Sequence, residues 1–374
     1  MLRSNFLVRR WVVMLAAVAA LIVVSASLGA AQMDDSGAVY VLSNQSSNSV
    51  LVYARGANGS VSFSGSFSTG GAGMGTGGDP LGSQGSLVLG RWHRLLFAVN
   101  AGSNDVSVFA VEGRGLQLHL LDRVSSGGTM PVSIAVHGRL LYVLNAGGTP
   151  NIQGFFLEPF GGHLVALPGS ARMVPGGASS AAAEIAFSSD GEVLMVTEKG
   201  TNQIDTWTIN DDGYANDVMT ASSSGLTPFG FAIVHNIAVV SEAMSGGLSS
   251  YEIEENMPAK LVTGPVSDTQ AAVCWVVVTR NGLYAFGTNT GSGTISSYSI
   301  SRDGSLTLLE VEAGTTGAGT APIDMALSRN SSFLYVREAT RGMVDGFRVE
   351  SNGSLTPITS AGGVPLGAQG IAAF

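Results

Sequence analysis

The segment Leu141-Tyr-Val-Leu-Asn145 is one copy of a short phrase that recurs along the chain. Each copy is a run of mostly apolar residues that ends in a small or polar residue, and successive copies start about 49 residues apart. Self-similarity at this spacing indicates one repeated structural unit per copy. The seven copies begin at Val39, Leu96, Leu141, Leu194, Ala238, Leu283 and Leu334.

Four strand-like runs make up each unit. The phrase is followed, after a few small residues, by an alternating run such as Ile295 to Ile300, which predicts a paired antiparallel strand. A hairpin dipeptide such as Asp303-Gly304 comes next and leads into a weaker strand at Leu306 to Leu309. Ahead of the phrase lies a further apolar run, often introduced by proline as at Pro322 to Leu327. Four strands per repeat are typical of a β-propeller blade.

The two ends of the repeat array complement each other. The first repeat lacks a leading strand, and the chain finishes on Gly370-Ile-Ala-Ala-Phe374, which resembles a leading strand without a partner. We therefore expect the last strand to complete the first blade. The chain after its N-terminal segment carries no helix periodicity, and Met74 to Gly90 reads as a glycine-rich connection. The sequence predicts an all-β, seven-bladed β-propeller with four-stranded antiparallel blades, in one domain over residues 35–374.

The N-terminal segment has the features of an export signal. Three arginines precede the uninterrupted apolar run from Val12 to Val24, and small residues follow at Gly29 to Ala31. This order predicts a signal peptide over residues 1–31, and hence an exported protein that is secreted, periplasmic or held at the cell surface. As the alternative, the 20 residues from Val12 to Ala31 could just span a bilayer as an uncleaved anchor.

The charge of the remaining chain disfavours polyanionic partners. Without the three N-terminal arginines, 15 basic side chains stand against 27 acidic ones, and no basic cluster occurs elsewhere. We therefore expect neither nucleic acid nor an anionic membrane as a partner, apart from a membrane contact if the N-terminal segment stays uncleaved. Cys274 is the only cysteine, which excludes an internal disulfide and predicts a buried, inert thiol.

Two phrases carry a family resemblance: Leu-Phe-Ala-Val-Asn-Ala-Gly-Ser-Asn-Asp-Val-Ser-Val-Phe, from Leu96 to Phe109, and Asp303-Gly-Ser-Leu-Thr307. With them the chain resembles the lactonase family of seven-bladed β-propellers, which includes 6-phosphogluconolactonase and carboxymuconate cyclase. The resemblance covers essentially the whole chain after the N-terminal segment. It implies a lactone hydrolase or lactonising cyclase that acts on a small sugar or muconate lactone at the mouth of the central channel. The family's enzymes place histidine, acidic and arginine side chains there.

The chain departs from this pattern where the enzymes of the family carry histidine. Their leading strands often have a histidine shortly after the proline, and at about that place this chain has Ser133, Glu184, Gly230 and Asp324. No His-x-His occurs either, so the catalytic residues of the family cannot be transferred one by one. A second resemblance fits Leu141 to Asn145 equally well, to exported propellers with Tyr-Val-Thr-Asn repeats that serve as surface or binding proteins.

Two acidic residues, Glu184 and Asp324, interrupt apolar leading strands at matching repeat positions. Water that attacks a lactone carbonyl needs a general base, and both residues are candidates for that role. The developing oxyanion needs a donor or cation, for which Lys199 and Arg337, at the ends of the second strands, are the candidates. The alternative is a water-filled channel whose polar walls have no catalytic role.

Other polar residues have a simpler interpretation. Residues at the ends of the second strands are expected to bond turn backbones rather than form a ligand ring. Two acidic residues from opposite blades could share Ca²⁺, but no Asp-rich loop supports such a site, and we expect no metal or other cofactor. His137, His235 and His93 are expected at exposed positions. The strand-end residues are Asn100, Asn145, Glu198, Glu242 and Glu338.

Two functions of different classes stay open. The first is an exported lactone hydrolase or cyclase that acts on an unphosphorylated lactone, because basic residues that would bind a phosphate are scarce. The second is a non-catalytic propeller that binds a small molecule or a protein on one face of its disc. A closed seven-bladed ring is self-sufficient, so a monomer is expected in either case.

Overall fold

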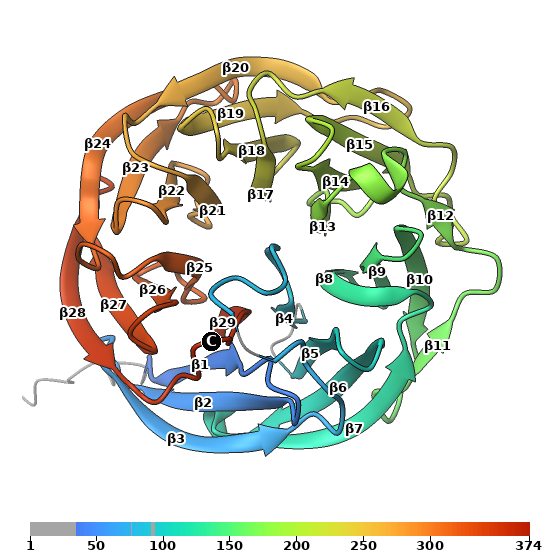
Figure 1. Cartoon of the computed structure of the whole chain (residues 1–374), viewed down its shortest axis with the longest axis horizontal. Coiled ribbons are helices and arrows are strands. Elements are labelled where there is room, and N and C mark those ends of the chain that lie inside the picture. Colours follow the sequence, from blue (N-terminus) through green and yellow to red (C-terminus); the bar gives the residue numbers. More distant parts are fainter. Residues whose placement is uncertain (1–34, 76, 91–93) are drawn as a thin grey trace, which may run out of the picture. The chain divides into compact units, whose positions relative to one another are not determined.

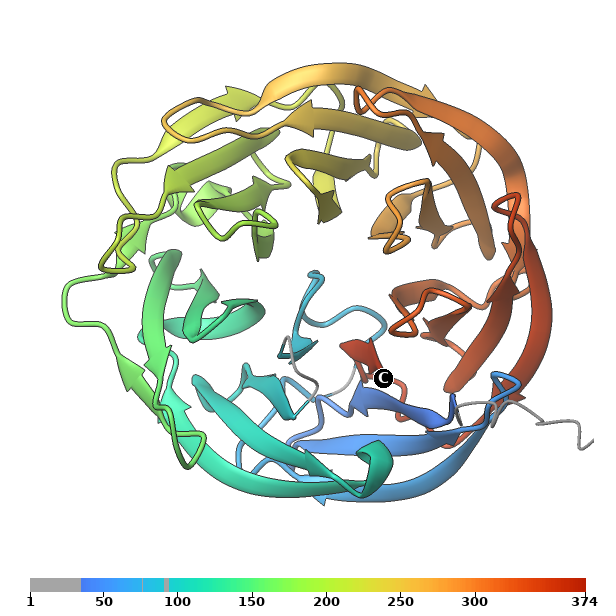
Figure 2. The same cartoon turned by 180° about the vertical axis from the view of Figure 1, so that it is seen from behind.

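The computed structural model describes residues 35–75, 77–90 and 94–374, and these form one compact unit from Asp35 to Phe374. The unit is a seven-bladed β-propeller, in which seven antiparallel sheets are arranged around a central axis (Figure 1). Figure 2 shows the ring from behind. The predicted signal peptide, residues 1–31, and His93 lie outside the described residues. Of the helices in the described part, none has the length and apolar character needed to cross a membrane.

Blades 1 to 3 contain the following strands, in order from the channel outward. Blade 1 consists of β29 (Ile371–Ala373), β1 (Gly37–Leu42), β2 (Ser49–Arg55) and β3 (Val61–Ser68). Blade 2 consists of β4 (Leu87–Leu89), β5 (Leu95–Asn100), β6 (Asp105–Glu112) and β7 (Gln117–Ser125), with the short 3-10 helix η1 (Gly113–Gly115) between the last two. Blade 3 consists of β8 (Thr129–His137), β9 (Leu140–Gly147), β10 (Asn151–Leu157) and a fourth strand that is split into β11 (Leu164–Ala166) and β12 (Arg172–Met173).

Blades 4 to 7 repeat this arrangement with four strands each. Blade 4 follows the 3-10 helix η2 (Gly177–Ser179) and consists of β13 (Ala182–Phe187), β14 (Val193–Glu198), β15 (Gln203–Thr208) and β16 (Met219–Ser222). Blade 5 consists of β17 (Pro228–Val234), β18 (Ile237–Glu242), β19 (Gly247–Glu252) and β20 (Lys260–Ser267). Blade 6 consists of β21 (Val273–Val278), β22 (Tyr284–Asn289), β23 (Thr294–Ile300) and β24 (Leu306–Thr315). Blade 7 consists of β25 (Pro322–Leu327), β26 (Phe333–Glu338), β27 (Met343–Val349) and β28 (Leu355–Ala361).

The C-terminal strand closes the ring, which confirms the prediction from the sequence. β29 is the inner strand of blade 1 and pairs antiparallel with β1, so that Tyr40 stands opposite Ala372. The contact continues beyond the strand, where Leu42 N donates to Gly370 O at 2.9 Å. Because the first and last repeats share one sheet, neither end of the array leaves a blade incomplete.

Tyrosines of the repeated phrase tie one blade to the next. The hydroxyl of Tyr142 on β9 donates to Gly213 O at 2.9 Å, and the hydroxyl of Tyr335 on β26 donates to Gly59 O at 2.9 Å. Both glycines stand in hairpins between third and fourth strands, and both have a φ of 84°. Glycine adopts this conformation without steric cost. In these two cases a tyrosine of the repeated phrase thus bonds to the hairpin glycine of the next blade.

Five of the seven inner strands carry a β-bulge close to their start. In blade 4 the register shifts between Ala182 and Glu184, and in blade 7 it shifts between Ile323 and Met325. The inserted residue in blade 7 is Asp324, whose φ of 57° lies in the left-handed region. A bulge bends its strand and re-aims the side chains around it. Its position therefore decides which side chains near the strand start reach the channel.

The segment between β3 and β4, predicted as a plain connection, reaches into the middle of the ring (Figure 1). We name residues 79–86 the plug. The side-chain amide of Gln84 donates to Phe231 O at 3.1 Å and to Val276 O at 2.8 Å, and it accepts from Val276 N at 3.0 Å. Gln84 thereby pairs with the inner strands of blades 5 and 6 as a neighbouring strand would.

A second residue of the plug, Ser83, anchors it to two further elements. Its backbone O accepts from Trp275 Nε1 and from Gln369 Nε2, each at 2.9 Å, and its hydroxyl donates to Val132 O at 2.9 Å. The plug therefore occupies part of the central channel. The plug satisfies the backbone groups that the inner strands present to the axis, which water would otherwise have to do.

Candidate functional site

The four candidate residues come from two blades. Glu184 lies on β13 of blade 4, and Asp324 lies on β25 of blade 7. Lys199 directly follows β14, and Arg337 is the penultimate residue of β26. Because second strands run antiparallel to inner strands, both cations lie at the mouth where the inner strands begin. The cations therefore belong to that mouth, whereas the two acidic residues lie further along the inner strands.

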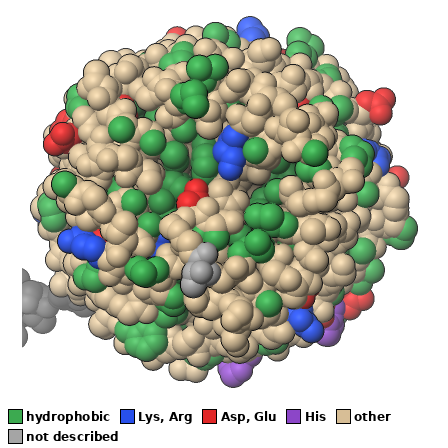
Figure 3. Space-filling view, viewed as in Figure 1, with side chains coloured by type: hydrophobic (Ala, Val, Ile, Leu, Met, Phe, Trp, Pro, Cys, Tyr) green, Lys and Arg blue, Asp and Glu red, His purple; other side chains and the backbone are tan. Residues whose placement is uncertain are grey.

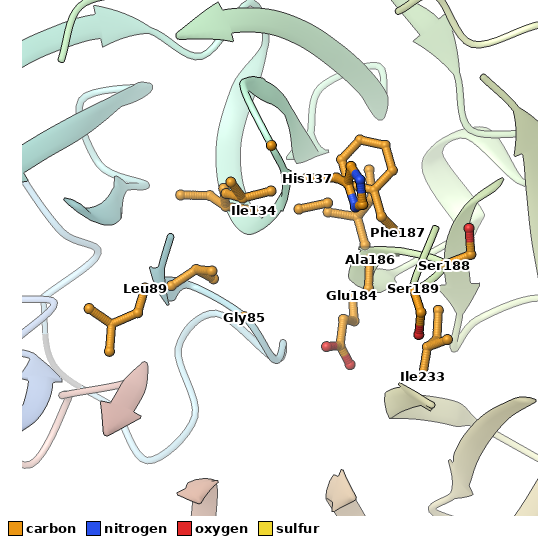
Figure 4. Close-up of a pocket in the computed structure, with 15 residues that line it drawn as sticks. Gly85, Leu89, Ile134, His137, Glu184, Ala186, Phe187, Ser188, Ser189 and Ile233 are labelled. Atoms are coloured by element: carbon orange, nitrogen blue, oxygen red, sulfur yellow. The ribbon is translucent and has the colours of Figure 1, made fainter. Parts of the chain in front are cut away.

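Glu184 lies deep in a pocket at the opposite mouth, where the inner strands end (Figure 4). The pocket has a volume of about 510 Å³ and is lined by residues of β4, β8, β13 and β17. The Glu184 side chain projects toward the middle of the ring, with its carboxyl directed away from His137 and Phe187. It is only 6% exposed. The pocket thus ends at a single enclosed carboxyl group.

Burial controls the ionisation of Glu184. Its Oε2 accepts a hydrogen bond from Phe231 N at 2.6 Å. Burial nevertheless raises the pKa of Glu184 well above its ordinary value; the Phe231 N–H opposes this rise, and the Asp324 carboxyl adds to it. Among the described residues that line the pocket, only Glu184 and His137 have acidic or basic side chains. The carboxyl therefore stays protonated to a higher pH than a surface glutamate would.

Asp324 is not one of the residues that line this pocket. It is 3% exposed, and its Oδ1 accepts from Met325 N at 3.0 Å while Oδ2 lacks a hydrogen-bond partner within the described structure. Burial raises the pKa of Asp324 to about 7, although backbone N–H groups lower it. As the bulge residue itself, Asp324 is enclosed in the wall of the ring, whereas Glu184 reaches a pocket.

Lys199 contacts the plug at the other mouth. Its ammonium group donates to Gly82 O and lies 4.6 Å from the centroid of the Phe229 ring. Burial lowers the pKa of Lys199, and the charge of Asp79 opposes this effect. The ammonium group therefore already interacts with a backbone carbonyl and with an aromatic ring of the protein.

Arg337 also holds loop segments. It is fully buried, and its Nη2 donates to Pro365 O at 3.1 Å and to Leu366 O at 2.6 Å. Its Nη1 donates to Gly78 O at 3.4 Å, directly before the plug. Burial lowers the pKa of Arg337 to about 10. Both candidate oxyanion stabilisers thus donate to backbone carbonyls in this structure.

Asp79, in the plug, is a charged residue that the sequence analysis did not single out. Its Oδ1 accepts from Gly82 N at 2.9 Å. The side chain keeps contact with solvent, yet the protein around it raises its pKa by desolvation, and the charge of Lys199 opposes that shift. On the face seen in Figure 3, an acidic and a basic group lie beside a hydrophobic hollow near the middle of the ring. The only signal in the sequence was a lone acidic residue within a glycine-rich segment.

Buried carboxyl pairs were also missed. Glu198 and Asp205 are fully buried in blade 4, and Glu338 and Asp345 are buried in blade 7 at the same spacing. Burial, and then the hydrogen bond to Glu198, raises the pKa of Asp205 to about 8. Burial and Glu338 raise the pKa of Asp345 to about 7, and Arg341 lowers it. Two carboxyls in contact share a proton, so each pair connects its second strand to its third.

The expected backbone contacts of the strand-end residues are confirmed for some and wrong for others. Glu198 Oε1 accepts from Gly176 N at 2.8 Å, as expected. Asn100 instead donates to two side chains, to Asp105 Oδ1 at 2.6 Å and to Ser107 Oγ at 2.8 Å. These two partners lie on the adjacent third strand, and Asn100 Oδ1 also accepts from Asn48 Nδ2 and Thr69 Oγ1 of blade 1, so the side chain connects strands and blades rather than a turn.

The histidines and the cysteine have structural surroundings. His137, expected at an exposed rim, is half-buried and lines the pocket, with its ring centroid 6.0 Å from that of Phe187. His235 is exposed, as expected. Cys274 is partly buried, and burial raises the pKa of its thiol to about 12. Within the ranges that the structure describes, no group of three or more His, Cys, Asp or Glu could hold a metal ion.

Comparison with protein families gives one match within the chain. A family model described as Lactonase, 7-bladed beta-propeller, matches residues 165–257. This segment begins in the fourth strand of blade 3, contains all of blade 4 and ends after the third strand of blade 5. No curated protein matches the chain.

Solved structures share the fold over nearly their whole length. The periplasmic gluconolactonase of Pseudomonas aeruginosa has a TM-score of 0.67 at 17% identity, over 89% of this chain and 98% of that one. A candidate 6-phosphogluconolactonase of Bacteroides uniformis has a TM-score of 0.67 at 17% identity, over 90% and 99%. A protein of Lactobacillus plantarum reaches 0.70 at 16% identity, over 90% and 98%. The family match over residues 165–257 and the seven-bladed ring together support the resemblance found in the repeats: the chain is a seven-bladed β-propeller similar to the lactonase family.

Proposed function

We propose that this protein is an exported, monomeric lactonase-like propeller that hydrolyses a small unphosphorylated lactone in the pocket around Glu184. The observation that carries the proposal is a buried carboxyl with a raised pKa at the end of a pocket of about 510 Å³. Titratable groups with strongly shifted pKa values in concave sites are frequent acids and bases of enzymes. Glu184 is the only residue of the four sequence candidates that lines the pocket.

The chemistry needs one proton acceptor. In its ionised form Glu184 takes a proton from water as the water oxygen bonds to the lactone carbonyl carbon. The bond between that carbon and the ring oxygen then breaks, and the ring oxygen takes up a proton, so that a hydroxy acid leaves. A raised pKa makes the Glu184 carboxylate a stronger base than a surface carboxylate, at the cost of a smaller ionised fraction at low pH.

The substrate class follows from the charges around the pocket. No lysine or arginine lines it among the described residues, and phosphate recognition depends on such groups. A phosphate would instead approach Glu184. The names of two structural relatives, a gluconolactonase and a candidate 6-phosphogluconolactonase, support a lactone as substrate, and the periplasmic location of the first supports export.

A non-catalytic ligand-binding propeller is the second candidate, and one observation favours it. Lys199 and Arg337 donate to carbonyls of the loops around the plug, and neither lines the pocket. Without a cation or a pair of free donors, the negative charge that develops on the carbonyl oxygen would receive little stabilisation. A pocket of this kind would still bind a small molecule.

The test is hydrolysis of a panel of unphosphorylated lactones by the purified protein, with Glu184→Gln as the variant and Asp324→Asn as the matched control. Glu184→Gln should lower turnover at least ten-fold, about 1.4 kcal/mol of barrier, while Asp324→Asn keeps most of it. After subtraction of the buffer rate, the activity of the wild-type protein should rise with pH as Glu184 ionises, with a midpoint above the ordinary glutamate value.

Two results would decide against this assignment. An equal loss in Asp324→Asn would move the reaction away from the pocket. No turnover above buffer on any lactone would replace the hydrolase with the binding protein.

A further inference from the structure

We propose that the lactone bound in the Glu184 pocket carries an alkyl or aryl substituent rather than the hydroxyl groups of a sugar. This inference rests on the proposed function, because it names the substrate class of the same site. Its basis is the set of side chains and backbone groups of the pocket that remain available to a ligand.

Large apolar side chains form part of the accessible wall of the pocket. They come from four inner strands and are partly exposed, and they lie beside the accessible polar side chains of His137 and Ser189. A ligand can contact them because they are not sealed in the core. Burial of apolar ligand surface against such side chains is favourable, whereas each hydroxyl moved there without a partner is costly. These residues are Val88 and Leu89 of β4, Val136 of β8, Phe187 of β13 and Ile233 of β17.

The polar groups next to Glu184 are already paired. Phe231 N donates to Glu184, Ile185 N donates to Ser133 Oγ at 3.2 Å, and Ile134 N donates to Gly85 O of the plug at 2.9 Å. These are backbone donors of the inner strands close to the Glu184 carboxyl. Hydroxyls of a sugar lactone would therefore find few donors at the deep end of the pocket.

The serine at the pocket wall is also occupied. Ser188 Oγ donates to Asp190 Oδ1 at 2.5 Å and accepts from Val193 N at 2.9 Å, so its hydroxyl completes a turn. The Glu184 carboxyl also has a side-chain hydrogen bond with Gln84 of the plug, so the groups left for a ligand are its remaining acceptor sites, the half-buried His137 and the exposed Ser189. A polyhydroxylated ring needs more partners than these.

The apolar surface continues beyond the pocket at the same mouth. The inner strands of blades 6 and 7 end in pairs of partly exposed apolar residues, as β4 does in blade 2. A substituent that leaves the pocket toward the axis would meet further aliphatic side chains rather than charges. The residues are Val277 and Val278 of β21 and Ala326 and Leu327 of β25.

Three lactones with the same six-membered ring test the proposal. They are δ-valerolactone, δ-octanolactone, which adds a propyl group, and D-glucono-δ-lactone, which adds hydroxyls. Each buried methylene is worth about four-fold in kcat/KM, so the propyl compound should exceed δ-valerolactone by on the order of fifty-fold if the chain is fully buried. D-glucono-δ-lactone should be the poorest of the three.

A pair of variants tests whether the preference for the propyl compound arises in the Glu184 pocket. Ile233→Ser, in the pocket wall, should reduce the ratio of kcat/KM for the propyl compound to that for δ-valerolactone at least five-fold. Leu283→Ser, at a residue that is 50% exposed and does not line the pocket, should change neither value. Thermal midpoints of both variants show whether the fold is retained.

The outcomes separate the two claims. Best turnover of D-glucono-δ-lactone would overturn the apolar substrate and leave the hydrolase intact. If no lactone is hydrolysed, the proposed function fails, and calorimetric titration of the same three compounds still tests the inference. Binding of δ-octanolactone no tighter than that of D-glucono-δ-lactone would then overturn it.

Discussion

Blade 4 and blade 7 carry acidic side chains at the same positions of the repeat: one on the inner strand, a glutamate at the end of the second strand, and an aspartate on the third. Each blade also has a cation next to that glutamate, after it in blade 4 and before it in blade 7. All four candidate residues from the sequence belong to these two blades. In blade 4 the residues are Glu184, Lys199, Glu198 and Asp205, and in blade 7 they are Asp324, Arg337, Glu338 and Asp345.

The environments of these residues differ because of two small changes. In blade 4 the bulge residue precedes Glu184, which pairs with Thr197, whereas in blade 7 Asp324 is the bulge residue and has no strand partner. Three residues after the strand-end glutamate, blade 4 has Thr201 and blade 7 has Arg341. Equivalent repeat positions therefore do not imply equivalent roles. A shift of one residue in the position of the bulge leaves Glu184 in the pocket and Asp324 enclosed in the wall of the ring.

The largest effect should come from Arg337, the cation of blade 7, and it should exceed that of Lys199, the cation of blade 4. Arg337→Met should lower the free energy of unfolding by about 3 kcal/mol, because three carbonyls lose a charged donor in a fully buried place. Lys199→Met should cost about 1 kcal/mol, since its group is half-buried and bonds one carbonyl. Urea unfolding measures both, with Arg337→Lys as the control that keeps the charge. Equal losses in the two methionine variants would contradict the difference between the blades.

The carboxyl pairs should differ in their response to pH. A carboxyl whose pKa is raised in the folded state binds its proton more tightly there, so stability falls as pH rises from the ordinary value to the raised one. For Asp205 this decline extends to about pH 8, and for Asp345 it ends near pH 7. Asp205→Asn should therefore gain about 2 kcal/mol relative to the wild-type protein between pH 5 and pH 8.

Urea midpoints at intervals from pH 5 to pH 9 give this comparison directly. Asp345→Asn should gain less above pH 7, because Arg341 already offsets part of the charge in blade 7. The exposed Asp211→Asn serves as the control and should follow the wild-type curve. A parallel pH dependence of wild type and Asp205→Asn would show that the blade 4 pair does not share a proton.

The smallest effect should come from the tyrosine contacts at the boundaries of these blades. Tyr335→Phe removes one hydrogen bond from blade 7 to blade 1 and should cost about 1 kcal/mol. Tyr142→Phe removes two, because its hydroxyl also accepts from Ala215 N at 2.9 Å in blade 4, and it should cost somewhat more. Thermal or urea unfolding would contradict this order if Tyr335→Phe were the more destabilised variant.

The architecture could be predicted because the strands and turns of each blade are marked by residue patterns that recur along the chain. The seven copies of the repeated phrase predicted the second strands, and dipeptides such as Asp303-Gly304 predicted the hairpins. The segment from Gly370 to Phe374, which has no partner in its own repeat, predicted the closure of the ring. Each of these signals is local, and each depends on a residue type that few other conformations favour. The repeat was therefore enough to predict the fold, and no contact between distant residues had to be known.

The site could be predicted only in part. Glu184 was found because a charge in an apolar strand is conspicuous, but its separation from Asp324 depends on the position of a bulge. The plug could not be predicted, because Gln84 holds it in place through hydrogen bonds to Phe231 and Val276, which are far away in the sequence. Glycine-rich composition indicates a connection and says nothing of where it leads.

The closure of blade 1 has a consequence for how the protein is made. Tyr40 and Ala372 face each other in one sheet although nearly the whole chain lies between them. Synthesis proceeds from the N-terminus, so β1 emerges early and its channel-side edge stays unpaired until β29 arrives. The entropy of closing so long a loop makes this pairing a late and slow event in folding. Folding intermediates of this propeller should therefore be most prone to aggregation at the free edge of β1.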